Sequence, residues 1–235
     1  MITILPLASS SAGNSYKVTD GKTALLLEAG LTIKELRRAL DFRLSDIAGC
    51  LISHEHGDHA KGARELLKVG IDLYASAGTF EALHLFDYRT HVIHARQQFT
   101  LGTWTIMPFE TEHDAAESIG FLLANQQDEK LLFITDSFYC RYTFSGLTHI
   151  MIEANFSERI LNENIASGRV PAAMKSRLLR SHFSLENVKD FLRANDMSRV
   201  QGIWLLHLSD NNSDETEFKR EIQALTGKPI MIAKR

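Results

Sequence analysis

A nine-residue run, Leu-Ile-Ser-His-Glu-His-Gly-Asp-His, places four metal-ligating side chains within six positions, directly after an apolar segment. In an extended backbone side chains alternate between two faces, so His54 and His56 project the same way and can share one metal ion. Gly57 permits a sharp turn, after which Asp58 and His59 can point at a second ion. Imidazole and carboxylate ligands together suit zinc or manganese. The alternative is a solvated polar loop whose histidines are coincidental.

Three later candidate ligands share a position of another kind: each stands at the end of an apolar, strand-like run. His113 lies in the polar segment 110–114, Asp136 follows the apolar residues 131–135, and His207 ends another apolar run. Each alone would more often be a loop or core residue. Together they place ligands at strand ends that open onto one edge of a β scaffold, as in many protein metal sites. His113 can complete three histidines around the first ion, His207 can complete the second site, and Asp136 can bridge the two.

Short strand-like runs and helical patterns must position these ligands. We expect strands at 2–7, 15–19, 23–28, 47–53, 99–109, 118–124, 130–135, 149–154, 203–208 and 230–233. We expect helices at 32–42, from an N-cap at Asp58 through Val69, and at 79–86, 157–167, 171–180, 184–194 and 214–225. Asp20-Gly21 predicts a hairpin turn between two early strands. This order predicts an α/β (α+β) fold with two mixed β-sheets sandwiched between outer helices, as one domain over residues 1–235.

Composition agrees with a globular protein that has no overall basic footprint for nucleic acid. Hydrophobic residues make up 44% of the 235 residues, charged residues 23%, and the net charge is −3. Cys50 and Cys140 lack a CxxC spacing, and nothing requires a disulfide, which fits a reducing compartment. The N-terminus lacks the basic and apolar regions of a signal peptide, and no apolar run approaches ~18 residues. We therefore expect a cytoplasmic protein without a membrane span.

With these ligands in this order, the chain resembles the metallo-β-lactamase fold superfamily over essentially its whole length. That resemblance implies a four-layer αββα sandwich and a centre for two divalent ions, Zn²⁺ or Mn²⁺. Glu55, inside the motif, is variable in the superfamily and receives no metal role. The implied ligands are His54, His56 and His113 for the first ion, Asp58, His59 and His207 for the second, and Asp136 as the bridge.

The chemistry of such a centre is hydrolysis. Two ions ~3.5–4 Å apart can hold a bridging hydroxide as the nucleophile, lower the pKa of its parent water and neutralise a developing oxyanion. We count Asp58 as a catalytic residue as well as a ligand. Esters, lactams, thioesters and phosphodiesters are all compatible with this chemistry, so the motif predicts a reaction type and leaves the substrate open.

Two further segments resemble the arrangement in ribonuclease Z, where a Glu on one strand orients a His that precedes the last ligand strand. Here they are Met-Ile-Glu-Ala-Asn-Phe around Glu153 and Ser-His-Phe-Ser around His182. The resemblance implies that Glu153 holds His182, and that His182 contacts the scissile phosphate or protonates the leaving oxygen, which a poor alkoxide leaving group requires. The alternative makes Ser181 an N-terminal residue of helix 184–194 and His182 a packing residue. The remaining histidines are expected on the surface or in the core: His84, His91, His94 and His149.

Several stretches also resemble the WalJ/YycJ branch of the superfamily, namely 7–15, 53–62, 113–116, 153–155 and 182–212. This resemblance implies a DNA exonuclease that acts in the 5′ to 3′ direction, or at least a phosphodiesterase. One position departs from the superfamily pattern, since Glu28 stands where Asp is usual. That position is generally structural, so the departure bears on loop packing.

Basic residues could contact a nucleic-acid backbone. Four of them cluster in the helical segment that leads into His182: Arg169, Lys175, Arg177 and Arg180. We name Arg177 and Arg180 as substrate-binding residues, whose phosphate contacts would make binding salt-sensitive. Asn14 and Ser15 could present backbone N–H groups to a phosphate near the metals. The alternative for the cations is a solvated helix face. No base-reading motif is evident, so little sequence specificity is expected.

Two other function classes stay open. One is a small-molecule hydrolase that acts on a cyclic nucleotide or other phosphate diester, or on a lactone or thioester. A thioesterase is disfavoured because His113 is followed by Asp-Ala-Ala, without the glyoxalase-like Gly-His-Thr-Pro-Gly-His run. The other is a metal-stabilised binding module without activity, which the complete ligand set disfavours. The expected partner is thus a nucleic acid, DNA above all, or a small phosphodiester; oligomeric state does not follow from the sequence.

Overall fold

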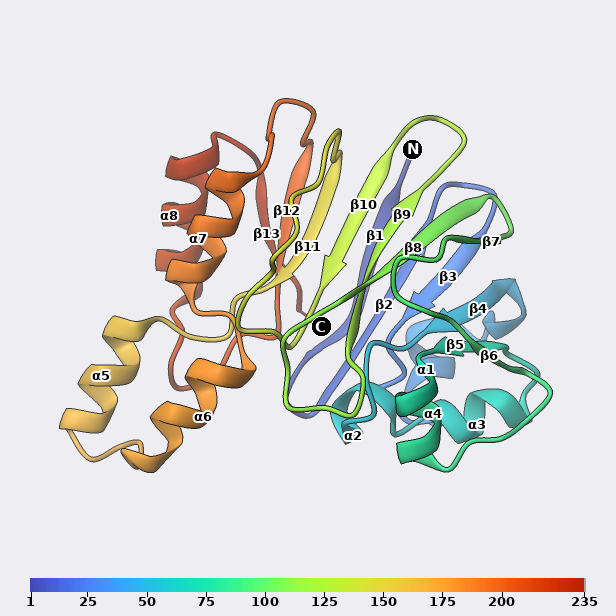
Figure 1. The fold of residues 1–235 in the computed structure, drawn as a ribbon, viewed down its shortest axis with the longest axis horizontal. Coiled ribbons are helices and arrows are strands. Elements are labelled where there is room, and N and C mark those ends of the chain that lie inside the picture. Colours follow the sequence, from blue (N-terminus) through green and yellow to red (C-terminus); the bar gives the residue numbers. More distant parts are fainter. Residues whose placement is uncertain (235) are drawn as a thin grey trace. The chain divides into compact units, whose positions relative to one another are not determined.

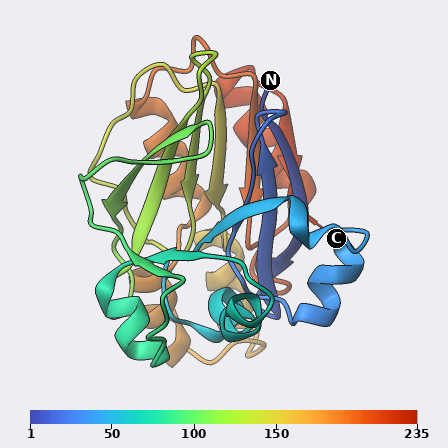
Figure 2. The same cartoon turned by 90° about the vertical axis from the view of Figure 1, so that its right-hand side faces the viewer.

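A computed structural model describes residues 1–234, and the chain folds as two compact units. Unit 1 comprises residues 1–110 and 115–129, together with Lys234. Unit 2 comprises residues 111–114 and 130–233. Figures 1 and 2 show the helices and strands of both.

Unit 1 contains a six-stranded sheet in sequential order. Its strands are β1 (Thr3–Ser10), β2 (Gly13–Thr19), β3 (Ala24–Leu27), β4 (Ile47–Leu51), β5 (Leu73–Ala75) and β6 (Thr90–Val92). The first three strands are antiparallel, and the predicted Asp20-Gly21 turn joins β2 to β3, with Gly21 at φ 91°. From β3 onward the strands are parallel, which requires a crossover segment between each pair.

Helices of unit 1 supply these crossovers and cover the sheet. They are α1 (Ile33–Ala39), α2 (Gly57–Ala60), α3 (Ala63–Lys68) and α4 (Ala77–Leu83), with a short 3-10 turn at Leu44–Asp46. Leu26 and Ile52 on the sheet side pack in one buried core with Leu66 and Phe80 of the helices. This unit also contains three antiparallel strands of the seven-stranded sheet: β7 (Phe99–Leu101), β8 (Trp104–Glu110) and β9 (Ile119–Ala124).

Unit 2 is built on four parallel strands. They are β10 (Lys130–Ile134), β11 (His149–Glu153), β12 (Gly202–Leu206) and β13 (Ile230–Ile232), paired in that order. Nearly every residue of β10, β11 and β12 is buried, as expected for parallel strands covered on both faces. The helices are α5 (Glu158–Ala166), α6 (Ala173–Ser181), α7 (Leu185–Ala194) and α8 (Glu215–Thr226). In Figure 1, α7 and α8 lie beside the strands, whereas α5 and α6 lie beyond the strands' carboxyl ends.

Most predicted elements occur within a few residues of their expected bounds, and three expectations were wrong. The strand expected at 99–109 is two strands, because the chain turns at Gly102 with φ 59°. The helix expected from Asp58 to Val69 is divided into α2 and α3, and His56, not Asp58, is the N-cap of α2. Strands β5 and β6 were not predicted, since three residues are too few to show a periodic pattern. Over residues 1–234 no helix has the length and apolarity needed to cross a bilayer.

The motif loop of unit 1 rests on a close backbone approach at Gly30. A Cβ atom at this position would lie 1.8 Å from Asp58 O and 2.5 Å from Asn14 N, both backbone atoms that cannot rotate away. The Gly30 N–H donates to Asn14 O at 2.9 Å, and the Ala29 N–H donates to His59 O at 2.8 Å. The residues that follow β3 therefore hold both the start of β2 and helix α2. By contrast Gly57, inside the motif, has open space around its Cβ position and no left-handed φ.

These two glycines give opposite expectations for alanine. Gly30→Ala should lower the free energy of unfolding by at least about 2 kcal/mol, because backbone must move to admit the methyl group. Gly57→Ala should leave it within about 1 kcal/mol of the parent, because the site is open and helical. Urea denaturation of the two variants checks both values. Equal stability of Gly30→Ala and the parent would contradict the close approach.

Candidate metal centre

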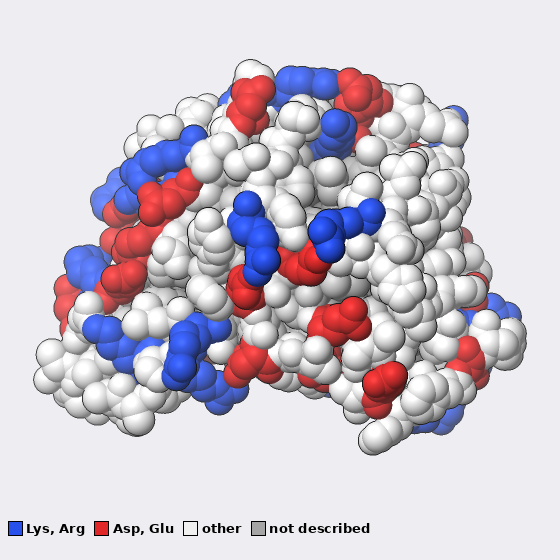
Figure 3. All heavy atoms as spheres, in the orientation of Figure 1, with Lys and Arg blue, Asp and Glu red and all other residues white. Residues whose placement is uncertain are grey.

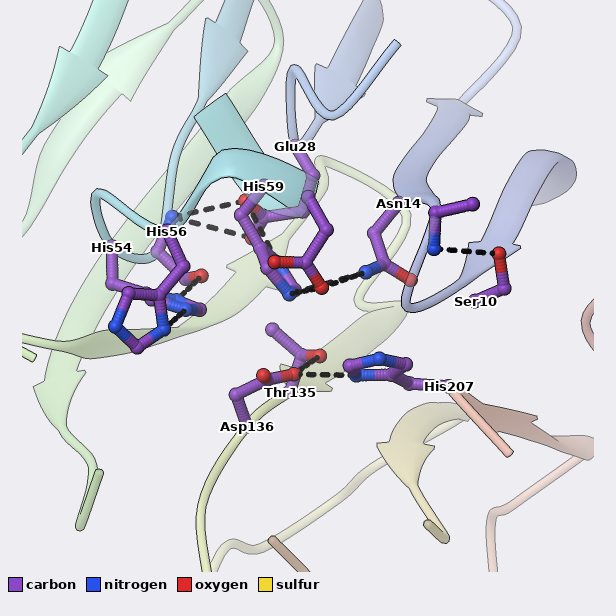
Figure 4. A network of polar contacts seen from close by, with 12 residues as sticks. Ser10, Asn14, Glu28, His54, His56, His59, Thr135, Asp136 and His207 are labelled. Atoms are coloured by element: carbon purple, nitrogen blue, oxygen red, sulfur yellow. Dashed lines mark hydrogen bonds and ion pairs between the residues drawn. The ribbon is translucent and has the colours of Figure 1, made fainter. Parts of the chain in front are cut away.

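In unit 1, His54 and His56 follow the buried end of β4 and turn their imidazoles toward one another. His54 Nε2 lies 3.1 Å from His56 Nδ1 (Figure 4). His54 is fully buried, and its Nδ1 lies 2.8 Å from Ser53 Oγ. The Ser53 hydroxyl at Nδ1 fixes the orientation of the His54 ring.

The second pair of motif ligands, Asp58 and His59, is held from two sides within unit 1. Asn14 Nδ2 lies 3.1 Å from His59 Nε2 and donates to Asp58 Oδ2 at 3.3 Å (Figure 4). Asn14 and Ser15 are both fully buried, and the Ser15 hydroxyl donates to Glu28 O. These contacts let the Asn14 side chain orient Asp58 and His59; the phosphate contact expected of the backbone N–H groups stays a prediction.

Glu28 holds the other side of His59. Its carboxylate is fully buried, with Oε2 3.5 Å from His59 Nδ1, and it accepts the Ser53 N–H at 3.2 Å. The residue has φ 68°, which turns the chain after β3. A carboxylate on the second nitrogen of a metal-binding histidine fixes the ring and its tautomer. Glu in place of the usual Asp therefore still ties the motif loop to a histidine ligand.

In unit 2, Asp136 and His207 follow the parallel strands β10 and β12 and face one another. Both are buried, and His207 Nδ1 lies 2.8 Å from Asp136 Oδ1 (Figure 4). The Thr135 hydroxyl donates to the same carboxylate oxygen. Asp136 and His207 have φ values of 40° and 51°, a left-handed region that costs a side-chain-bearing residue about 1–3 kcal/mol and occurs preferentially at functional sites.

Glu153, at the end of β11, holds His182. Its Oε1 lies 2.6 Å from His182 Nδ1, and its Oε2 accepts the N–H groups of Phe183 and Ser137 at 3.0 and 3.2 Å. Burial alone would raise the pKa of Glu153, but His182 outweighs burial and holds that pKa below its ordinary value. Burial likewise opposes charge on His182, yet Glu153 raises its pKa. The pair is therefore an ionised carboxylate that orients a histidine.

The alternative reading of Ser181 was wrong. Ser181 is the last residue of α6, whereas the N-cap of α7 is Ser184, whose hydroxyl accepts the Asn187 N–H. Ser181 instead contributes its carbonyl oxygen, which accepts a hydrogen bond from His113 Nδ1 at 2.8 Å. His113 Nε2 lies 3.8 Å from Asp136 Oδ2.

The donor set of this cluster fits a divalent cation. One ligand atom from each of four side chains lies within 4.8 Å of the others: Asp136, Glu153, His182 and His207. Two buried carboxylates at such a distance require positive charge nearby. Burial opposes a proton on His207, but Asp136 and Glu153 raise the pKa of His207 to about 10. A proton on this histidine thus supplies charge that a bound metal ion would supply instead.

The predicted phosphate-binding cations lie on or beside α6. Figure 3 shows Lys and Arg side chains gathered over the region of α5 and α6. Arg177 is exposed. The Arg180 guanidinium donates to Ser176 O and Oγ, both at 3.0 Å, and the Lys175 ammonium donates to Asn162 Oδ1. Arg180 and Lys175 thus bond to neighbouring residues of the chain, so Arg177 is the residue whose substitution best tests phosphate binding.

Sequence reasoning missed the residues that orient the ligands. The contact of Asn14 with His59 joins residues 45 positions apart, and Ser137 is tied to Glu153 across 16 positions. No periodic pattern connects such residues. The one available signal was position, since Ser53 and Ser137 directly adjoin the ligands His54 and Asp136.

Comparisons with known proteins bear on the family and the fold of the chain. A β-lactamase superfamily domain model matches residues 23–161. Exodeoxyribonuclease WalJ of Streptococcus pneumoniae serotype 2 is 31% identical over 224 residues, which cover 88% of this chain and 81% of WalJ. Exodeoxyribonuclease YycJ of Bacillus anthracis is 31% identical over 225 residues, which cover 89% of this chain and 83% of YycJ. Among solved structures, the metallo-β-lactamase fold protein YhfI of Bacillus subtilis has a TM-score of 0.75 at 15% identity and covers 99% of this chain and 96% of YhfI. The last likeness confirms the predicted metallo-β-lactamase fold.

The cluster in unit 2 predicts that a divalent metal stabilises the protein. At about 100 times its dissociation constant, an ion that binds only the folded state adds about 2.7 kcal/mol, which raises Tm by several degrees. Thermal unfolding of the chelator-treated protein, with and without added Zn²⁺ or Mn²⁺, measures this increment. Asp136→Asn should lose most of it, whereas Asp190→Asn, an exposed change on α7, should retain it. If added metal stabilises Asp136→Asn as much as it stabilises the parent, the assignment of Asp136 as a metal ligand is contradicted.

Proposed function

We propose that this chain is a two-metal exodeoxyribonuclease that degrades DNA from the 5′ end. The chain is a metal-dependent hydrolase, and it belongs to the β-lactamase superfamily and to its WalJ/YycJ branch. The observation that carries the phosphodiesterase assignment is the contact of 2.6 Å between Glu153 and His182 beside a buried ligand cluster. The choice of DNA rests on the two exodeoxyribonucleases, which match the chain over more than four-fifths of its length.

The proposed ligands are those of the superfamily pattern: His54, His56 and His113 for one ion, Asp58, His59 and His207 for the other, and Asp136 for both. When bound, two Zn²⁺ or Mn²⁺ ions would activate a water molecule and neutralise charge that develops on the phosphate. The fold supports this set, because Ser53, Glu28 and Ser181 engage the Nδ1 atoms of three histidines. A partner at Nδ1 fixes the ring and its tautomer, so Nε2 is the atom through which each of these histidines would bind a metal.

In this proposal His182 donates a proton to the departing alkoxide oxygen. An alkoxide is a poor leaving group, so a positioned acid lowers the barrier to its departure. Glu153 accepts a hydrogen bond at Nδ1 and favours the protonated ring, so Nε2 carries a proton that it can give up. The N–H groups of Phe183 and Ser137 fix Glu153 in turn, and this chain of contacts orients the acid.

A small-molecule phosphodiesterase is the second candidate, and charge is the observation that favours it. The chain has a net charge of −3 and so offers no overall basic surface for nucleic acid. A short phosphate diester needs no extended basic surface, whereas a long nucleic acid binds chiefly through its backbone phosphates. Activity on 5′-phosphorylated DNA, measured beside an activated small diester, separates the two candidates.

His182→Ala tests the proton-donor role through the leaving group. On 5′-phosphorylated DNA, where the leaving group is an alkoxide, we expect kcat to fall by about 10²- to 10⁴-fold. On bis(4-nitrophenyl) phosphate, whose nitrophenolate leaves without a proton, we expect little change. Metal content, measured by mass spectrometry, should match the parent.

The matched control is His84→Ala, which removes a histidine outside the cluster, at the C-cap of α4. It should cleave both substrates like the parent. An equal loss on the two substrates in His182→Ala would show that the residue acts on something other than the leaving group.

Arg177→Glu tests phosphate binding by α6. It should raise KM for DNA at low salt and reduce the slope of log KM against log salt concentration by about 1, because one phosphate contact is lost. Hydrolysis of bis(4-nitrophenyl) phosphate should be unaffected. Lys219→Glu makes the same charge change on α8 and should leave the slope unaltered. If both variants behave alike, net charge and not a contact at α6 governs binding.

A further inference from the structure

Unit 2 contains an aromatic-lined cavity that the metal ligands do not use. It has a volume of about 300 Å³ and lies between residues 139–143 and helix α7. Tyr139, Phe183 and Phe191 contribute rings to its lining, and Asn187 and Asp190 contribute polar groups. Phe183 and Phe191 are buried, whereas Tyr139 is 55% exposed. The cavity, which we call the aromatic pocket, thus combines a buried apolar floor with an accessible ring.

The aromatic pocket is tied to the ligand cluster through its own residues. Phe183 directly follows His182, so their Cα atoms lie about 3.8 Å apart, and its N–H donates to Glu153. Tyr139 is three residues beyond Asp136, and its carbonyl oxygen accepts the Ser137 hydroxyl at 2.8 Å. The backbone that carries the exposed ring is therefore fixed beside the cluster.

A second connection reaches the segment that carries His113. Arg141, also in the lining, forms an ion pair with Glu112, the residue before His113. Asn187 Nδ2 donates to Phe138 O at 2.9 Å, which joins α7 to the same wall. The wall of the pocket is thus held at Asp136, at Glu112 and at α7, all within unit 2.

We propose that the aromatic pocket binds the nucleobase of a nucleotide adjacent to the cleaved phosphate. This inference rests on the proposed function, since it assumes a nucleotide substrate. A planar heterocycle suits aromatic walls, and every base presents a π-face that can stack on Tyr139. An amide N–H of Asn187 donates to Phe138 O, which orients the side chain. The carbonyl oxygen of the same amide can then accept a hydrogen bond from an N–H group of the base.

The chemistry of the walls also indicates how selective such a pocket is. Stacking on an aromatic ring contributes about 1–3 kcal/mol per base and tolerates any sequence. Asn187 and Asp190 supply acceptor oxygens, so bases with exocyclic amino groups gain a hydrogen bond there. The pocket therefore distinguishes a nucleotide from an abasic residue strongly, and one base from another weakly.

Tyr139→Ala, assayed on a pair of DNA substrates, tests the proposal. Both are 5′-phosphorylated duplexes, one with natural nucleotides beside the cleaved bond and one with abasic tetrahydrofuran residues there. We expect kcat/KM of Tyr139→Ala to fall about 5- to 150-fold on the natural duplex, which is 1–3 kcal/mol converted to a ratio. On the abasic duplex, parent and variant should be equal, because no base is present to stack.

Two further variants make the result specific to a ring at this position. Tyr139→Phe keeps the ring and should restore at least most of the activity on the natural duplex. Tyr88→Ala removes another exposed tyrosine, 82% exposed in unit 1, and should not distinguish the two duplexes. Equal losses on both duplexes in Tyr139→Ala, or no loss on either, would overturn the proposal.

Failure of the proposed function gives a different result. A parent protein that cleaves bis(4-nitrophenyl) phosphate but neither duplex is not a DNA exonuclease. Base binding by the aromatic pocket is then tested with thymidine 5′-(4-nitrophenyl phosphate) and with the matching ester that lacks the base. A preference of the parent for the thymidine ester that Tyr139→Ala abolishes supports base binding by a small-molecule phosphodiesterase. Equal rates on the two esters overturn it.

Discussion

Burial of the Glu153 carboxylate is the constraint on which the chemistry of unit 2 depends. An ionised carboxylate removed from water costs several kcal/mol unless its oxygens are paired. Glu153 meets this requirement with two backbone N–H groups and the His182 ring, and it lies 3.4 Å from His207. The hydrogen bonds to this one carboxylate therefore fix three parts of unit 2: Ser137 after β10, Phe183 before α7, and His182, the acid of the proposed reaction. The same contacts fix the backbone of Phe183, and the Ser137 hydroxyl donates to the carbonyl oxygen of Tyr139.

Unit 1 uses the same device at Glu28. This carboxylate is also fully buried, and it lies against the Ser53 N–H and the second nitrogen of His59. In both units a buried acid lies against the Nδ1 atom of a histidine. Packing of Gly30 against the backbone of Asp58 then fixes where the motif loop lies. Ligand geometry is thus determined by residues that need not touch the metal.

The sequence predicts the ligand types and the order of the elements well, because both are local patterns. The HxHxDH motif and the alternation of apolar strands with helices lead to the ligands at strand ends and to the metallo-β-lactamase fold that the structural comparison confirms. Contacts between distant residues lie beyond such patterns. Asn14 reaches His59 through tertiary packing, and helix α2 has His56, not the expected Asp58, as its N-cap. The pocket beside Phe183 likewise brings residues 139–143 against α7, which no spacing predicts.

Metal stoichiometry tests the central claim, a binuclear centre, most directly. The measurement is the ratio of zinc or manganese to protein in the full chain, loaded with excess metal, freed of unbound ions and analysed by inductively coupled plasma mass spectrometry. The account predicts two ions per chain, because the ligand set divides into two groups that share Asp136. A ratio of one or below at saturation would contradict it.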